Sequence, residues 1–86
     1  MNMQPEEEAN MNNRNNVIAK LGRQNTIRIF EAGSGRLMRE IAVNGTVCDN
    51  PVCEETNVSV EVISEGKKYK DSFNPITGAL KSRELV

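Results

Sequence analysis

A hairpin-like segment occurs twice in this chain, and no other sequence feature constrains the fold as strongly. The first hairpin spans residues 26–41 and the second spans residues 69–85. Self-similarity at a fixed period is typical of repeated supersecondary units. We therefore expect one architecture built twice. An offset of 43 residues aligns four pairs of residues: Phe30 with Phe73, Ser34 with Thr77, Gly35 with Gly78, and Leu37 with Leu80.

The aromatic content bears on how such a domain can build a core. The 86 residues include two Phe, one Tyr and no Trp, so valine and isoleucine have to fill most of the interior. A domain of roughly 70 residues buries only about 60% of the surface that its unfolded chain exposes, and is marginally stable alone. We therefore expect one small domain that covers apolar surface with other copies of itself, as a homo-oligomer.

Residues 1–16 have a different composition from the rest of the chain. They carry three consecutive Glu and six Asn, too little apolar surface to offset the entropy of ordering, so we predict a disordered tail. An acidic N-terminus is the reverse of a signal peptide, and no apolar run approaches the ~18 residues of a membrane span. We expect a cytoplasmic chain that does not enter a membrane.

Alternating side chains predict three strands in the first half of the domain. Residues 17–21 form a short apolar run, which is typical of a strand. In residues 26–31, Ile27 and Ile29 fall on one face of the expected strand. The glycines that follow permit the turn between this strand and the next one.

The third strand and the link after it give two further expectations. In residues 36–43, Leu37 and Ile41 are predicted to share one face, with Arg39 between them. The Asn44-Gly45 dipeptide that follows favours a tight hairpin, because both residues tolerate left-handed φ.

The second half predicts four more strands. The fourth is interrupted around Pro51, which lacks an N–H donor for a strand ladder. The fifth has a stripe of valines at alternate positions, which indicates a buried face. The sixth covers residues 67–73 and the seventh residues 79–86. Short connections favour antiparallel neighbours, so we predict an all-β fold: an antiparallel meander of about seven short strands. The valine stripe consists of Val58, Val60 and Val62.

The order of these pieces resembles the blade repeats of quinoprotein-type (PQQ-like) β-propellers. The resemblance rests on Asn50-Pro51-Val52, residues 56–60, Gly66-Lys67-Lys68-Tyr69 and residues 73–80. It covers about two blades, 17–43 and 46–86, and implies propeller-blade architecture. The Trp that follows Leu in the family is replaced by Met38 and Lys81. Nothing here resembles the family's cofactor and calcium ligands, so the resemblance implies neither a cofactor nor dehydrogenase activity.

Two blades cannot close a propeller, which typically needs four to eight. Three arrangements remain open: a ring assembled from several chains, a small barrel or two-sheet sandwich, or a dimer that pairs sheet edges. Closure is favoured physically because an open sheet presents unpaired edge N–H and C=O groups.

The residue types present limit which catalytic systems this chain can build. It has no histidine, so Ser-His and Cys-His nucleophilic systems are excluded. Cys48 and Cys53 supply at most half of a tetrahedral zinc site, and a disulfide between them would be unusual in a reducing cytoplasm. We interpret both as small buried hydrophobic residues. We predict no enzymatic activity, no cofactor and no metal.

Two polar features remain. Alternation places Asp71 on the same side as Tyr69 and Phe73, so its carboxylate either is a buried group tied to a turn or lines a site, and we favour the first interpretation. A mildly basic strip is the only candidate ligand contact, and a solvated strand face explains it better than anion or nucleic-acid binding. The strip consists of Arg28, Lys67, Lys68 and Lys70.

These features predict a non-enzymatic, self-assembling protein-interaction module. A lectin-like ring that binds ligands between blades is the first alternative, although sugar sites of that kind rely on aromatic platforms and this chain has no Trp. Weak nucleic-acid or anion binding through the basic strip is the second alternative. A formal net charge of −1 argues against nucleic acid as a partner.

Overall fold

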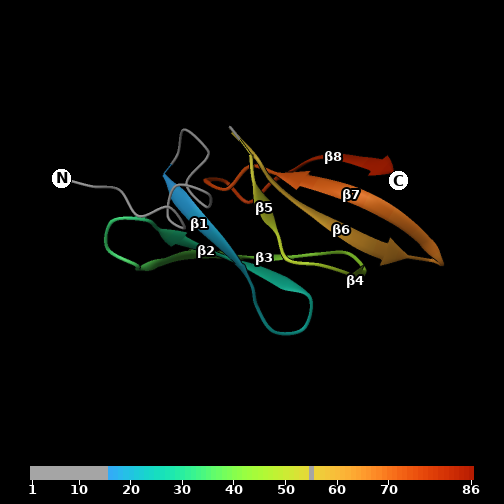
Figure 1. Ribbon diagram of the computed structural model, residues 1–86, viewed down its shortest axis with the longest axis horizontal. Coiled ribbons are helices and arrows are strands. Elements are labelled where there is room, and N and C mark those ends of the chain that lie inside the picture. Colours follow the sequence, from blue (N-terminus) through green and yellow to red (C-terminus); the bar gives the residue numbers. More distant parts are fainter. Residues whose placement is uncertain (1–15, 55) are drawn as a thin grey trace.

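The computed structural model describes residues 16–54 and 56–86, and every helix or strand in this part of the chain is a β-strand (Figure 1). The predicted all-β fold is confirmed. The first sheet has the order β1-β2-β3, with antiparallel pairing throughout. Its strands are β1 (Val17–Leu21), β2 (Thr26–Glu31) and β3 (Leu37–Ala42).

The second sheet has the order β4-β6-β7-β8, and β5 also pairs with β6. The predicted fourth strand is therefore present as two short pieces on either side of the Pro51 region, which makes eight strands instead of about seven. The strands are β4 (Thr46–Val47), β5 (Val52–Cys53), β6 (Val58–Ser64), β7 (Lys67–Phe73) and β8 (Leu80–Leu85).

The core lies between the two sheets. Alternate side chains of each strand point inward, and the valine stripe of β6 is buried as predicted. Full burial of one such side chain contributes about 1.5–3 kcal/mol. The first sheet contributes Val17, Ala19, Ile27, Ile29 and Ile41, and the second contributes Cys53, Val58, Val60, Val62 and Phe73.

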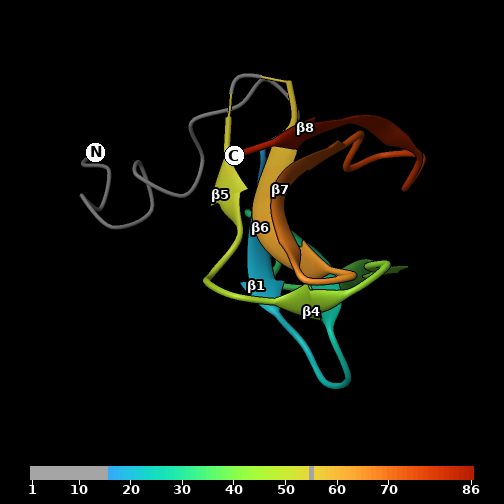
Figure 2. The same ribbon diagram turned by 90° about the vertical axis from the view of Figure 1, so that its right-hand side faces the viewer.

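One side of this two-sheet arrangement is closed and the other is open. On the closed side, β1 lies against β5 (Figure 2), and the Cys53 Sγ is 3.7 Å from the Val17 carbonyl oxygen. On the open side, β3 and β8 are the outermost strands of their sheets. The chain crosses from the first sheet to the second between β3 and β4.

The sequence repeat is a structural repeat. Phe30 pairs with Leu37 and Phe73 pairs with Leu80, and each pair follows a register shift at the same place in its hairpin. Both turns are closed by equivalent backbone bonds. These bonds are Glu31 N–H to Arg36 O at 2.8 Å and Asn74 N–H to Ala79 O at 2.9 Å.

The two hairpins nevertheless turn opposite faces to the core. Ile27 and Ile29 are fully buried between the sheets, whereas their counterparts 43 residues later, Lys70 and Ser72, are on the outer face of the second sheet. Phe73 points inward, while its counterpart Phe30 lies half-buried on the outer face of the first sheet. The face of the first hairpin that packs in the core is therefore equivalent to the face of the second hairpin that points outward.

The register shift overturns one sequence prediction. Leu37 was expected to face inward with Ile41, but it pairs with Phe30 on the outer face and is 48% exposed. Met38 is the extra residue of a β-bulge, and an extra residue reverses the alternation of side chains beyond it. Ile41 is buried as predicted.

The prediction of a hairpin at Asn44-Gly45 is also wrong, because β3 and β4 belong to different sheets. Gly45 has φ of 142° and passes so close to β6 that a Cβ there would lie 2.6 Å from the Ile63 carbonyl oxygen. The glycine therefore permits a close crossing between sheets, in place of a two-residue turn.

The predicted N-terminal tail, residues 1–16, lies outside the described residues except for Asn16. Residues 17–42 and 46–85 hold the strands of the first and second sheet, respectively. In the described ranges, no helix is long and apolar enough to cross a membrane.

Candidate functional site

The four predicted basic residues do not form one surface. Arg28 lies on the outer face of the first sheet, where its Nε is 2.7 Å from a Glu40 carboxylate oxygen. Lys68 and Lys70 are on the outer face of the second sheet. Lys67 is the first residue of β7 and points to the other side from Lys68.

Carboxylates lie beside both of the lysines that share a face. The Lys68 Nζ is 3.5 Å from Glu61, and the Lys70 Nζ is 3.2 Å from Glu54. The fold therefore brings Lys68 and Lys70 together with acidic groups and leaves Arg28 on the other sheet. Anion binding through this strip stays a prediction.

Asp71 is buried, as its place between Tyr69 and Phe73 predicted, and it is 1% exposed. Its carboxylate accepts two hydrogen bonds from Arg83 on β8, from Nε at 2.7 Å and from Nη2 at 2.8 Å. Such a two-bond pairing between a planar guanidinium and a carboxylate is strong and directional. Asp71 is therefore tied to the neighbouring strand and not to a turn.

Arg83 also makes contacts beyond Asp71. Its guanidinium lies 4.8 Å from the centre of the Tyr69 ring, and Nη2 donates to the Asn44 carbonyl oxygen at 2.9 Å. The hydrogen bonds that Arg83 donates to the Asp71 carboxylate raise the pKa of Arg83, although partial desolvation opposes this. The cluster holds β7, β8 and the sheet crossing together. Its hydrogen bonds are formed within the fold, so we assign it a structural role.

Sequence reasoning singled out Asp71 but missed Arg83. A signal was available in the repeat, because Arg28 and Glu40 occupy the positions equivalent to Asp71 and Arg83. Both pairs lie directly across neighbouring strands. In two hairpins of the same register, the same two positions lie opposite each other. Opposite charges at these positions in both hairpins therefore indicate a cross-strand pair in each.

The cysteines behave differently from one another. Cys53 is buried as predicted, whereas Cys48 is exposed, so the prediction of burial is wrong for Cys48. Cys48 falls in the interruption between β4 and β5, where the chain leaves the strand. Residues 16–54 and 56–86 contain no group of three or more His, Cys, Asp or Glu side chains arranged to hold a metal ion.

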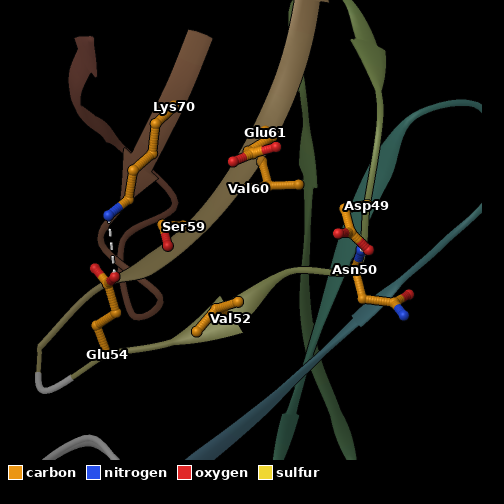
Figure 3. A pocket seen from close by; sticks show the side chains of 8 residues that line it. All are labelled: Asp49, Asn50, Val52, Glu54, Ser59, Val60, Glu61 and Lys70. Atoms are coloured by element: carbon orange, nitrogen blue, oxygen red, sulfur yellow. Dashed lines mark hydrogen bonds and ion pairs between the residues drawn. The ribbon is translucent and has the colours of Figure 1, made fainter. Parts of the chain in front are cut away.

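A pocket lies on the outer face of the second sheet beside this interruption. Val47 pairs with Val62 and Val52 with Ser59, so four residues of one strand stand opposite two of β6. The two surplus residues lift the chain from the sheet. They leave a cavity of about 230 Å³, bordered by residues 49–54 and by the outer side of β6 and β7 (Figure 3).

The pocket is lined mostly by polar and charged groups, together with Val52 and Val60. Three carboxylates border it, from Asp49, Glu54 and Glu61, and the only cation in the lining is Lys70. Figure 3 shows Lys70 and Glu54 joined by their ion pair at one end of the cavity, with Asp49 at the other. The pocket therefore carries an excess of negative charge.

The outer face of the first sheet carries an apolar row. Ile18 pairs with Phe30, and Phe30 pairs with Leu37, so the three side chains lie side by side across β1, β2 and β3. The Lys20 Nζ lies 5.7 Å from the centre of the Phe30 ring. We refer to Ile18, Phe30 and Leu37 as the apolar row.

Comparison with protein-family models, with curated proteins and with solved structures found no match to this chain. The resemblance to quinoprotein-type blades therefore stays a prediction, and function has to be argued from the residues themselves.

Proposed function

We propose that this chain is a non-enzymatic interaction module that self-associates through the apolar row. The observation that carries the proposal is that two equivalent rows of apolar side chains, one in each sheet, differ in the direction they face. In the second hairpin, the row of Val58, Phe73 and Leu80 faces the core, and the first sheet covers Val58 and Phe73. In the first hairpin the equivalent row faces outward.

Covering this row offers a clear gain in free energy. Leu37 is 48% exposed and Met38, next to it in the bulge, is 40% exposed. Burial of apolar surface contributes roughly 25 cal/mol per Å². A contiguous apolar group on the surface of a small domain is typical of an interaction site.

The partner that fits best is the same row on a second copy of the chain. The outer face of the second sheet is polar, since β6, β7 and β8 present Ser59, Ser72 and Ser82 side by side. Its exposed apolar side chains, Val52 and Ile63, form no row, because Val52 lies opposite Ser59 and Ile63 is four residues further along β6. In a two-fold dimer, the apolar row of one chain contacts the same row of the other chain. This is the self-complementary arrangement of most soluble dimers.

Charge and edges agree with a face-to-face dimer. Each face brings both signs, with Lys20 and Arg28 beside Glu40, so two copies can pair opposite charges. The outermost strands carry inward-pointing arginines, Arg39 on β3 and Arg83 on β8. Charges of this kind oppose edge-to-edge pairing of sheets.

Light scattering across a wide range of protein concentrations tests the proposal. We expect the mass to rise from that of one chain to that of two, and Leu37→Ser to shift this rise to higher concentration. Leu80→Ser is the matched control, because Leu80 is the repeat counterpart of Leu37 and is 53% exposed. A wild-type chain that stays monomeric throughout, or equal effects of the two variants, would refute the proposal.

A further inference from the structure

We infer that the pocket beside the β4–β5 interruption binds an alkyl cation: an ammonium or guanidinium group at the end of an aliphatic chain. This site lies on the second sheet, on the opposite side of the molecule from the apolar row. Cation binding at this site can therefore be tested independently of self-association.

Charge favours a cation in this pocket. Lys70 is already paired with Glu54 at 3.2 Å, which leaves Asp49 and Glu61 as the remaining charged groups of the lining. Lys68, which is outside the lining, forms an ion pair with Glu61 at 3.5 Å, so Asp49 is the one lining carboxylate without an ion pair to the described residues. The pocket thus keeps one uncompensated negative charge, and an anion entering it would meet like charge.

Ser59 supplies a second and independent observation. Its residue is only 3% exposed, and its hydroxyl makes no hydrogen bond to the residues that the structure describes. In that part of the chain, no fully buried side-chain polar atom lacks a partner. The small exposed part of Ser59 therefore includes its hydroxyl, which opens into the pocket that Ser59 lines (Figure 3).

The shape of the lining suits a ligand with a charged end and an apolar stem. The hydroxyl and the carboxylates accept hydrogen bonds from the several N–H groups of an ammonium or guanidinium. Val52, which is 56% exposed, lines the same cavity and can contact the methylene groups. A volume of about 230 Å³ accommodates a small group of this kind, not a large cofactor.

Titration of the ¹⁵N-labelled full chain, followed by amide chemical shifts, tests the inference. The probes are N-acetyl-arginine amide, which represents a side chain within a peptide, and agmatine, which represents a free small molecule with a guanidinium at one end and an ammonium at the other. We expect saturable shifts centred on residues 49–54 and 59–61. N-acetyl-citrulline amide is the neutral control, because it has nearly the same shape as the arginine probe without its charge.

Variants separate this site from general attraction to an acidic surface. Asp49→Asn and Glu61→Gln each remove one exposed charge, and we expect roughly two- to five-fold weaker binding from each. We expect Ser59→Ala to weaken binding as well, because it removes a hydroxyl that accepts a hydrogen bond from the ligand. Glu84→Gln is the matched control, since Glu84 lies opposite Lys70 on the same face but outside the pocket lining.

The outcomes are distinct. Binding of the arginine probe alone identifies a peptide side chain as the ligand source, and binding of both cations identifies the charged end as sufficient. Equal binding of the citrulline probe, shifts spread over the whole surface, or equal effects of Glu84→Gln and Glu61→Gln would overturn the inference. The spectrum of each variant verifies its fold in the same measurement.

Discussion

Arg83 donates two hydrogen bonds to the Asp71 carboxylate, of 2.7 and 2.8 Å, across neighbouring strands of the second sheet. At the equivalent positions of the first hairpin, Arg28 and Glu40 form an ion pair with the charges exchanged and about half of each side chain exposed. The two hairpins thus contain the same kind of cross-strand arginine–carboxylate pair, with a buried carboxylate in one and an exposed carboxylate in the other. This difference in burial leads to the first prediction.

Asp71→Asn should lower the free energy of unfolding by about 2 kcal/mol, because the buried carboxylate accepts two charge-assisted hydrogen bonds. Glu40→Gln is the matched variant in the exposed pair, and we expect a loss of less than about 1 kcal/mol. Urea denaturation of both variants measures the difference. Equal losses would show that burial adds nothing to the Asp71 pair.

The pKa of Arg83 predicts how the pair responds to alkali. The pKa is raised in the folded state by Asp71, so the folded state favours the charged form. The resulting stability is fully present below the ordinary pKa of arginine and is lost only as pH rises through the higher folded value. Between neutral pH and about pH 10, the stability difference between wild type and Arg83→Met should stay constant, as urea denaturation at several pH values can check.

Two glycines with positive φ should differ in their tolerance of alanine. Gly35 has φ of 74° and nothing within 4 Å of an added Cβ, so Gly35→Ala should cost about 1 kcal/mol from backbone strain alone. At Gly45 an added Cβ meets Val62 at 2.5 Å and the Ile63 carbonyl at 2.6 Å. Gly45→Ala should therefore cost about 3 kcal/mol. Thermal unfolding at one fixed concentration compares them, and similar costs would contradict the close approach at Gly45.

The cysteines should react at different rates. Cys48 is exposed and Cys53 is buried in the core, so a thiol reagent should modify one sulfur per folded chain quickly and the other only after unfolding. Cys48→Ser should remove the fast phase. A fast phase of two thiols per chain would mean that the Cys53 region opens readily.

Self-association predicts that stability depends on concentration. If the dimer forms through the apolar row, the midpoint of thermal unfolding should rise by a few degrees for each tenfold increase in protein concentration. Leu37→Ser should flatten this dependence, whereas Leu80→Ser should keep it. A concentration-independent midpoint in the wild type would contradict a stable dimer.

Much of the fold could be predicted from local patterns. The valine stripe of β6 and the alternation of Ile27 and Ile29 indicated the buried faces correctly, because apolar residues at alternate positions of a strand lie on the face that packs in the core. Leu37 and Gly45 were placed wrongly for different reasons. The bulge at Met38 inserts one residue into a hairpin, and the alternation of side chains does not reveal it. The link at Gly45 depends on the pairing of β4 with β6, which is distant in sequence and leaves no local pattern.

The candidate sites were harder to predict. Pro51 indicated that a strand is interrupted, but the pocket exists because β6 continues straight past that interruption. Asp71 was recognised as unusual, yet its partner Arg83 lies 12 residues away on the next strand. The excess negative charge of the pocket also appears only when residues 49–54 are set beside β6 and β7.

The shared residues of the two hairpins have a consequence for how the repeat is understood. Phe30 and Phe73 are the same residue type at the same place beside the bulge, but Phe30 is half-buried on the outer face and Phe73 is 4% exposed in the core. Core packing therefore cannot be what the two positions have in common. The common residues encode the local bend and turn of a hairpin, while the residues that differ, isoleucines in one and a lysine and a serine in the other, decide which way that hairpin faces.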